Sequence, residues 1–334
     1  MNVPRLLLLL CVAIVLMNVF FSSCKEKTGY TIVSTVSDSA SQIIIAKDEL
    51  NLNYELDQAV NEVLLATNIS RTASGDSSFT VVGNALFTTI KSAIIDTSHL
   101  LDSAKISITY AGINADLTKA RTGNISIKFA KDSSGKVIPW KTQGSIATLT
   151  FSQYEVIVQA TNKSLWMNGT GTITNVTGGI LRNATNLFLP HGDSLIDRIN
   201  LHIDFTYNDN TNIITTYAWN INQHRSFVLN DSTIISSISG DTTMNGFSNI
   251  STAGTTRSGS NFYTGITAPL VQKINSLYLL TNPLSGEENI HGITQPIDVV
   301  YGVDLSGNYT TTNPYGYKIT WINNGGQAQV VVSY

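Results

Sequence analysis

The chain contains little cysteine and little charge, and both shortages limit what kind of protein it can be. Only 2 of its 334 residues are cysteine, and only 13% are Asp, Glu, Lys or Arg. That charged share is about half of the roughly 25% found in ordinary globular proteins. The formal net charge of −3 at pH 7 excludes the strongly basic surface of a nucleic-acid-binding protein.

The short motifs that accompany common enzyme chemistry are also absent. The sequence has no G-x-S-x-G nucleophile elbow, no H-E-x-x-H zinc helix, no Walker phosphate loop and no G-x-G-x-x-G dinucleotide fingerprint. Ile, Val, Leu and aromatic residues nevertheless recur throughout, which excludes a disordered chain. We therefore expect a folded protein that is not an enzyme and that needs no cofactor.

An apolar run near the N-terminus stands out against this background. It covers residues 6–21 and is followed by the small residues Ser22 and Ser23, directly before Cys24. The run is shorter than the roughly 20 residues of a membrane span, and small residues suit a signal-peptidase cleavage site. We therefore predict a signal peptide over residues 1–23, with a plain membrane anchor or a signal cut elsewhere as alternatives.

The residues that end at Cys24 resemble the relaxed lipobox of Bacteroidota lipoproteins, here FFSSC. This resemblance implies that the Cys24 thiol is acylated, that the preceding peptide is removed and that lipid anchors the protein in the outer membrane. Cys11 would leave with the signal, so we expect no disulfide and a fold stabilised by its core. The charged residues 25–27 partly resemble the signals that send such lipoproteins to the cell surface.

One helix is predicted in the mature chain. Between Ser39 and Asn68, apolar residues recur at intervals of three and four, with acidic residues between them, as in an amphipathic helix. Asp38 or Ser39 can cap its first turn. Because the apolar stripe needs a partner, we expect the helix to dock on the following domain. Residues 24–70 are accordingly predicted to be a lipidated tether and helix.

After a polar break, the hydrophobic period changes from 3.6 to 2. Apolar and polar residues alternate in segments such as 106–110, 125–129 and 199–207, which is typical of half-buried strands. No segment between them has the pattern of a crossover helix, so antiparallel pairing is expected. We predict an all-β fold of mainly antiparallel sheets, a sandwich or an elongated meander, preceded by one N-terminal helix.

The predicted β domain covers residues 71–334. Strands that end in glycine recur along this domain at irregular intervals. This weak internal similarity leaves two related halves, 71–190 and 191–334, as an alternative.

The C-terminal residues predict a hairpin in a defined register. A two-residue loop at Asn324 and Gly325 pairs residues whose numbers sum to 649, which sets Trp321 opposite Ala328. The apolar residues of both strands then share one face, whereas a one-residue slip would set Trp321 against glutamine. We therefore expect Trp321 to be buried.

Motifs in the middle of the chain resemble an uncharacterised family of Bacteroidota outer-membrane lipoproteins. The motifs are R-x-G-x-I at 121–125, TF-x-x-Y-x-V at 150–156 and GT-x-T-x-T-N at 169–175. The resemblance covers residues 116–334 and implies an all-β fold in the cell envelope. It implies no activity, and it carries no disulfide or metal role because the family's cysteines have no counterparts here.

Exposed aromatic residues are the best candidates for ligand binding. Trp140 follows a proline in a turn-rich segment, and Trp166 precedes an Asn-Gly turn signal. We expect both side chains to be exposed, where they could form a stacking platform for a glycan.

Two sets of polar residues are weaker candidates for chemistry. His202 and Asp204 share a strand face that His224 could join, as metal ligands or an acid–base pair. Polar residues on an outer face explain the same pattern, and we predict no metal site. An Asx-rich segment, residues 204–212, could bind calcium weakly, but hairpin turn chemistry accounts for it better.

Four acidic residues near the C-terminus could supply a carboxylate pair for glycoside hydrolysis. They are Glu287, Glu288, Asp298 and Asp304. Adjacent glutamates in a turn more often face solvent, and that is the interpretation we favour.

Together these features predict a non-enzymatic, lipid-anchored envelope or cell-surface protein with a binding or structural role. A pilin-like or adhesin assembly subunit is one alternative, which an exposed edge strand at residues 327–334 would favour. A glycan-binding or glycan-hydrolysing surface protein is the other. The expected partners are the membrane, through acylated Cys24, and a glycan or an envelope protein; nucleic acid is not expected.

Overall fold

The computed structural model describes most of the chain after residue 30. The described residues are 31–32, 39–67, 70–75, 93–113, 117–183, 186–208, 214–275, 280–323 and 325–334. Cys24 and the predicted signal peptide lie outside them.

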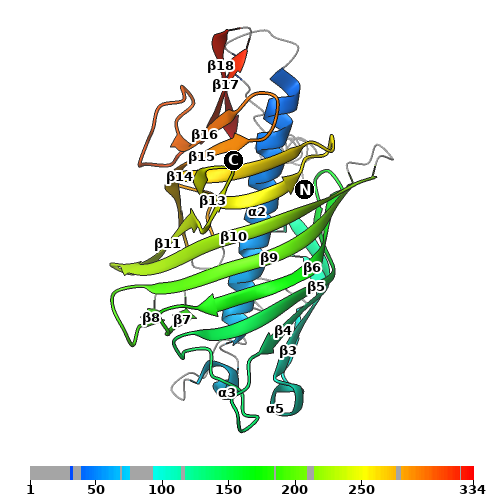
Figure 1. Ribbon diagram of the computed structural model, residues 1–334, viewed down its shortest axis with the longest axis vertical. Coiled ribbons are helices and arrows are strands. Elements are labelled where there is room, and N and C mark those ends of the chain that lie inside the picture. The colour runs from blue at the N-terminus through cyan, green and yellow to red at the C-terminus, as the bar shows by residue number, and fades with distance from the viewer. Residues whose placement is uncertain are drawn as a thin grey trace, which may run out of the picture.

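A long helix, α2 (Ser39–Thr67), forms the axis of the molecule (Figure 1). Its bounds agree with the predicted helix to within one residue, and its 29 residues span roughly 43 Å at 1.5 Å per residue. At its C-terminal end the Thr67 hydroxyl donates a hydrogen bond to the Leu64 carbonyl at 2.7 Å. In the part of the chain that the structure describes, no helix is long and apolar enough to span a membrane.

One antiparallel sheet of 16 strands curves around this helix, and its strands cross the helix axis obliquely (Figure 1). A separate hairpin is formed by β7 and β8, and two short helices, α3 (Arg71–Ser74) and α5 (Leu100–Ser103), complete the described elements. The strands are β1 (Thr31–Ile32), β2 (Ile94–Asp96), β3 (Lys105–Ile113), β4 (Lys119–Phe129), β5 (Ser145–Val158), β6 (Lys163–Asn175), β7 (Ile180–Asn183), β8 (Asn186–Phe188), β9 (Leu195–Asn208), β10 (Ile214–Asn230), β11 (Thr233–Gly240), β12 (Thr242–Met244), β13 (Phe247–Thr255), β14 (Asn261–Lys273), β15 (Ser285–His291), β16 (Ile297–Val303), β17 (Gly316–Asn323) and β18 (Gly326–Ser333).

The sheet is largely a meander, because most strands pair with their neighbours in the sequence. The order is β1-β18-β17-β16-β15-β14-β11-β10-β9-β6-β5-β4-β3-β2, and β13 pairs with β10, β12 and β14. The all-β, antiparallel prediction is therefore confirmed. Of the two predicted arrangements, sandwich and meander, the structure has the meander. In a sandwich a second sheet would cover the inner face, but here α2 covers it. The pairing of β6 with β9 carries one sheet across the boundary between the two proposed halves.

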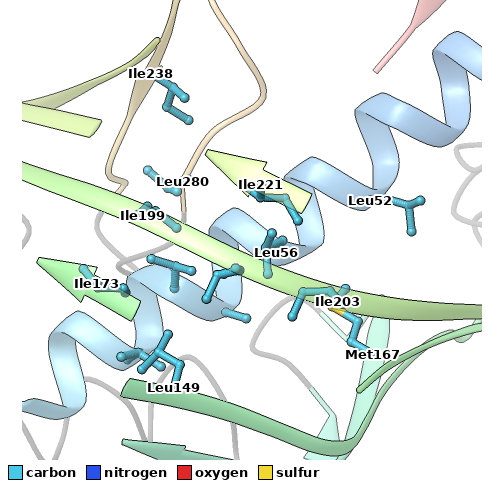
Figure 2. Packing of buried hydrophobic residues seen from close by; sticks show 14 of the residues in the cluster. Leu52, Leu56, Leu149, Met167, Ile173, Ile199, Ile203, Ile221, Ile238 and Leu280 are labelled. Atoms are coloured by element: carbon cyan, nitrogen blue, oxygen red, sulfur yellow. The ribbon is translucent and has the colours of Figure 1, made fainter. Parts of the chain in front are cut away.

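The core lies between the inner face of the sheet and α2. Figure 2 shows Leu52 and Leu56 of the helix among aliphatic side chains from several strands. Burial alternates along β5 and β9 as the period of 2 predicts. The labelled strand residues around the helix are Leu149, Met167, Ile173, Ile199, Ile203, Ile221 and Ile238.

Hydrogen bonds also attach α2 to the segment that follows β14. The Gln58 amide nitrogen donates to the Leu280 carbonyl at 2.7 Å, and the Leu280 backbone N–H donates to Gln58 Oε1 at 3.1 Å. The side chain of Gln58 thus pairs with both backbone groups of one residue, as a neighbouring strand would, and leaves neither group unsatisfied in the core.

The C-terminal hairpin has the predicted register. Trp321 pairs with Ala328, Ile319 with Val330 and Tyr317 with Val332, and Trp321 is 5% exposed. The outer edge of β18 is partly covered, because β1 pairs with it at Val330 and Val331.

Candidate functional site

Four of the five acidic residues of α2 do not face solvent, because the sheet curves around the helix. Glu49, Glu55, Asp57 and Glu62 are all buried. The docking that the apolar stripe predicted is therefore confirmed, but it also buries the polar face. Such groups are stable in a core only when they are paired or hydrogen bonded.

Strand β4 supplies cations for the C-terminal half of the helix. Arg121 Nη1 lies 2.8 Å from Glu62 Oε1, and Arg121 Nη2 lies 3.6 Å from Glu55 Oε2. Tyr110 donates a hydrogen bond from its hydroxyl to Glu62 Oε2 at 3.0 Å. Burial raises the pKa of Glu62, and the nearby Arg121 charge opposes this shift.

Strand β10 supplies the next cation. Arg225 is completely buried and forms an ion pair with Asp57. Burial raises the pKa of Asp57 to about 6, against the influence of Arg225. Ion pairs from two strands therefore fix the rotation and the height of α2 inside the sheet.

A cleft of about 280 Å³ opens between α2 and the ends of β4, β5, β6, β9 and β10. Its apolar lining includes Leu52, Val156 and Leu165, and the rings of Tyr207 and Tyr217 also contribute. This combination of an apolar floor and a few polar groups is typical of small-molecule sites.

Two ion pairs flank the cleft. Asp48 pairs with Arg257 from the turn between β13 and β14, and Glu55 pairs with Lys119 at the start of β4. Arg257 also lies over the Tyr207 ring, 3.8 Å from its centroid, a favourable cation–π contact. Burial raises the pKa of Asp48 to about 6, and Arg257 opposes the shift.

A third basic residue in the cleft lining has no ion-pair partner among the described residues. Lys163, at the start of β6, is exposed and forms no ion pair with any described residue. Both flanking acids are already paired, so the cleft has a surplus of positive charge. Its chemistry suits a small ligand with an apolar part and an anionic group.

Comparison with known proteins returned no match. No family model, no curated protein and no solved structure is similar to this chain.

The expectation that Trp140 is exposed was wrong. Its side chain is 2% exposed, and its backbone is fixed on both sides. Its N–H donates to the Ala73 carbonyl at 2.6 Å, and its carbonyl accepts from the Asn175 side chain at 2.8 Å. A turn-rich sequence does not reveal that the loop folds under the end of the sheet, where this ring has no access to a glycan.

Trp166 is exposed as expected. It is 40% exposed on the outer face of β6, and its ring nitrogen donates to Glu155 Oε1 at 2.5 Å. The ring can therefore contact a ligand outside the cleft.

The structure does not assemble the histidine candidates into one site. His202 Nε2 lies 3.9 Å from Asp204 Oδ1, whereas His224 is paired with Asp241 at 3.6 Å. No group of three His, Cys, Asp or Glu side chains capable of holding a metal occurs among the described residues. Asp204 belongs to β9. Residues 209–212 of the possible calcium loop lie outside the residues that the structure describes.

The four C-terminal acids do not share one face: Glu287 and Asp298 lie on the outer face of β15 and β16, Glu288 lies inside, and Asp304 lies in a turn. Asp298 accepts a hydrogen bond from Asn289 at 2.7 Å, and Asp304 accepts backbone N–H groups within a turn. Glu287 is exposed, but Glu288 is buried, so the expectation that Glu288 faces solvent was wrong. Both residues lie in β15 rather than in a turn, and neighbouring strand residues point to opposite faces.

Sequence reasoning missed the residues that line the cleft and the arginines that pair with α2. In β10, Arg225 is an even number of positions from the buried residues Trp219, Ile221 and Phe227, so it points to the same inner face. A charged residue at an inward position was therefore visible, and it predicts a buried partner of opposite charge.

Proposed function

We propose that this protein is a non-enzymatic, lipid-anchored envelope protein that binds a small amphipathic ligand in the cleft between α2 and the sheet. The observation that carries the proposal is the cleft itself, with its apolar floor and the unpaired Lys163 in its lining. Its volume of about 280 Å³ lies at the lower end of the roughly 300–1,000 Å³ of small-molecule sites. The ligand is accordingly small.

The location rests on the sequence. The lipobox that ends at Cys24 and the resemblance to Bacteroidota lipoproteins support an outer-membrane anchor, with the cell surface as the favoured face. A lipid anchor would hold the cleft close to the membrane, where a binding protein can collect a ligand that enters or leaves the cell.

Native mass spectrometry of protein purified from its own envelope fraction tests the proposal. Wild type should retain a small molecule that Lys163→Glu and Tyr207→Ala each lose, because these substitutions reverse a charge and remove a ring in the cleft. Circular dichroism should show that both variants remain folded. A retained molecule that is unaffected by either substitution would contradict the assignment to the cleft.

Glycan binding is a second candidate, supported by the exposed Trp166 ring on the outer face. Trp166→Ala leaves the cleft unchanged and serves as the matched variant in the same experiment. If Trp166→Ala abolishes binding to a glycan array and the two cleft variants do not, the outer face is the binding surface.

A further inference from the structure

Two completely buried carboxyl groups lie against each other where α2 meets β15. Glu49 and Glu288 are each 1% exposed. Burial and the adjacent Glu288 raise the pKa of Glu49, and burial raises the pKa of Glu288 to about 7. No described lysine or arginine forms an ion pair with either group. Like charges in a core need a compensating charge or a shared proton.

Two amide oxygens beside these carboxyl groups lack a donor. The Asn53 amide nitrogen donates to Glu49 Oε1 at 2.5 Å, so its oxygen is the free atom. Asn53 Oδ1 and Gln272 Oε1 are both buried and have no hydrogen-bond partner. Buried polar atoms are rarely left without a partner in a native protein, so both oxygens require an explanation.

All four side chains line one small cavity of about 20 Å³. A space of this size holds one water-sized particle. Tyr301 donates a hydrogen bond from its hydroxyl to Glu288 Oε2 at 2.5 Å and so helps to orient this carboxyl group.

The buried charges of the described core are also out of balance. Six acidic side chains are buried, but only two basic ones, Arg121 and Arg225. Arg121 pairs with Glu62, Arg225 with Asp57, and Lys119 reaches Glu55 from the edge. The acids without an ion pair are Asp197, Glu49 and Glu288, and the last two are the adjacent pair.

We propose that Glu49, Glu288, Asn53 and Gln272 form a binding site for one calcium ion that fastens α2 to the sheet. Calcium takes carboxylate and amide oxygens as ligands, and it tolerates irregular geometry. Zinc prefers nitrogen and sulfur, and magnesium usually keeps several waters that a cavity of this size does not admit. A single calcium ion compensates both carboxylates and gives both amide oxygens a partner.

The competing arrangement is one proton shared by the two carboxyl groups, with a water molecule in the cavity. The proton satisfies only the carboxyl groups, and the water must satisfy both amides. The two arrangements differ in what stabilises the folded protein, which is calcium in one case and acidic pH in the other.

The test measures metal content and thermal stability of the full-length lipoprotein purified in detergent without chelator. We expect about one calcium per chain by mass spectrometry of metals. After EGTA treatment, adding CaCl₂ at a hundredfold excess over Kd should raise Tm by roughly 5 °C, and MgCl₂ should raise it less.

Glu288→Gln should fold, because it removes the charge and keeps the shape, but it should lose the calcium-dependent rise in Tm. Glu287→Gln is the matched control, since Glu287 is the exposed neighbour on the opposite face of β15, and it should keep the rise. A Tm that is insensitive to EGTA and CaCl₂ would overturn the proposal. So would a calcium response that Glu288→Gln retains in full.

Discussion

Single residues in this protein show how burial reverses the ordinary preferences of charged side chains. Asp197 lies completely buried in β9, and neither carboxylate oxygen has a hydrogen-bond partner within the described structure. Burial raises the pKa of Asp197 to about 7, and the positive charge of Arg225 opposes the shift. Arg225 is itself paired with Asp57, so the cation nearest to Asp197 in charge effect already has another partner.

This arrangement predicts a pH dependence of stability. The unfolded chain releases the Asp197 proton near the ordinary value of 3.8, and the folded chain near 7. Between these values the folded state binds more protons, so the free energy of unfolding falls as pH rises through this window. The Tm of Asp197→Asn should therefore fall less than the Tm of wild type between pH 5 and pH 8.

Melting curves across that range provide the measurement. Five other buried or half-buried acids also have raised pKa values, so a shallower slope should persist in the variant; they are Asp48, Glu49, Asp57, Glu62 and Glu288. Asp204→Asn, at an exposed position of the same strand, should keep the wild-type slope. Equal slopes for Asp197→Asn and wild type would contradict the prediction.

At the scale of elements, the helix and the C-terminal hairpin depend on different kinds of contact. The helix is held by ion pairs and by a core that the sheet closes around it. The hairpin is held by a row of paired apolar residues on one face. The hairpin therefore permits a direct test of which face of β17 is buried.

Replacing Trp321 with alanine should lower the free energy of unfolding by about 3–5 kcal/mol, because the substitution leaves a cavity under β17. Ile322 is its neighbour on the opposite face and is 51% exposed, so Ile322→Ala should cost far less. Chemical denaturation of both variants provides the comparison. Equal losses of stability would mean that the two faces of β17 are not distinguished by burial.

At the scale of the whole molecule, the sequence predicts a lipid anchor at Cys24 that would fix the location of the protein. The apolar run before Cys24 is short, and two small residues separate it from the thiol. Cys24→Ala should abolish palmitate labelling and release the protein from the membrane fraction, or leave an uncleaved precursor. Labelling that survives the substitution would exclude the lipoprotein assignment.

Protease treatment of intact cells then separates the two faces of the outer membrane. Digestion of the wild-type protein supports display on the cell surface. Complete protection, with lipid still attached, would place it on the periplasmic leaflet.

Features that depend on near neighbours in the sequence were predictable. The helix from Ser39 to Thr67 was predicted because a period of 3.6 is a local property, and the hairpin register because a two-residue turn fixes its pairing. The all-β class was predicted for the same reason, since alternation identifies residues that share one face. The apolar run before Cys24 is likewise visible without any structure.

Only the tertiary structure decided which face is inside and what covers it. Alternation does not show that one sheet curves around the helix, so Glu288, Arg121 and Trp140 became buried against expectation or without any prediction. Their partners lie on distant segments, as Glu62 does for Arg121. Such pairs form only when the order of strands and the curvature of the sheet bring those segments together, and the cleft beside α2 arises in the same way.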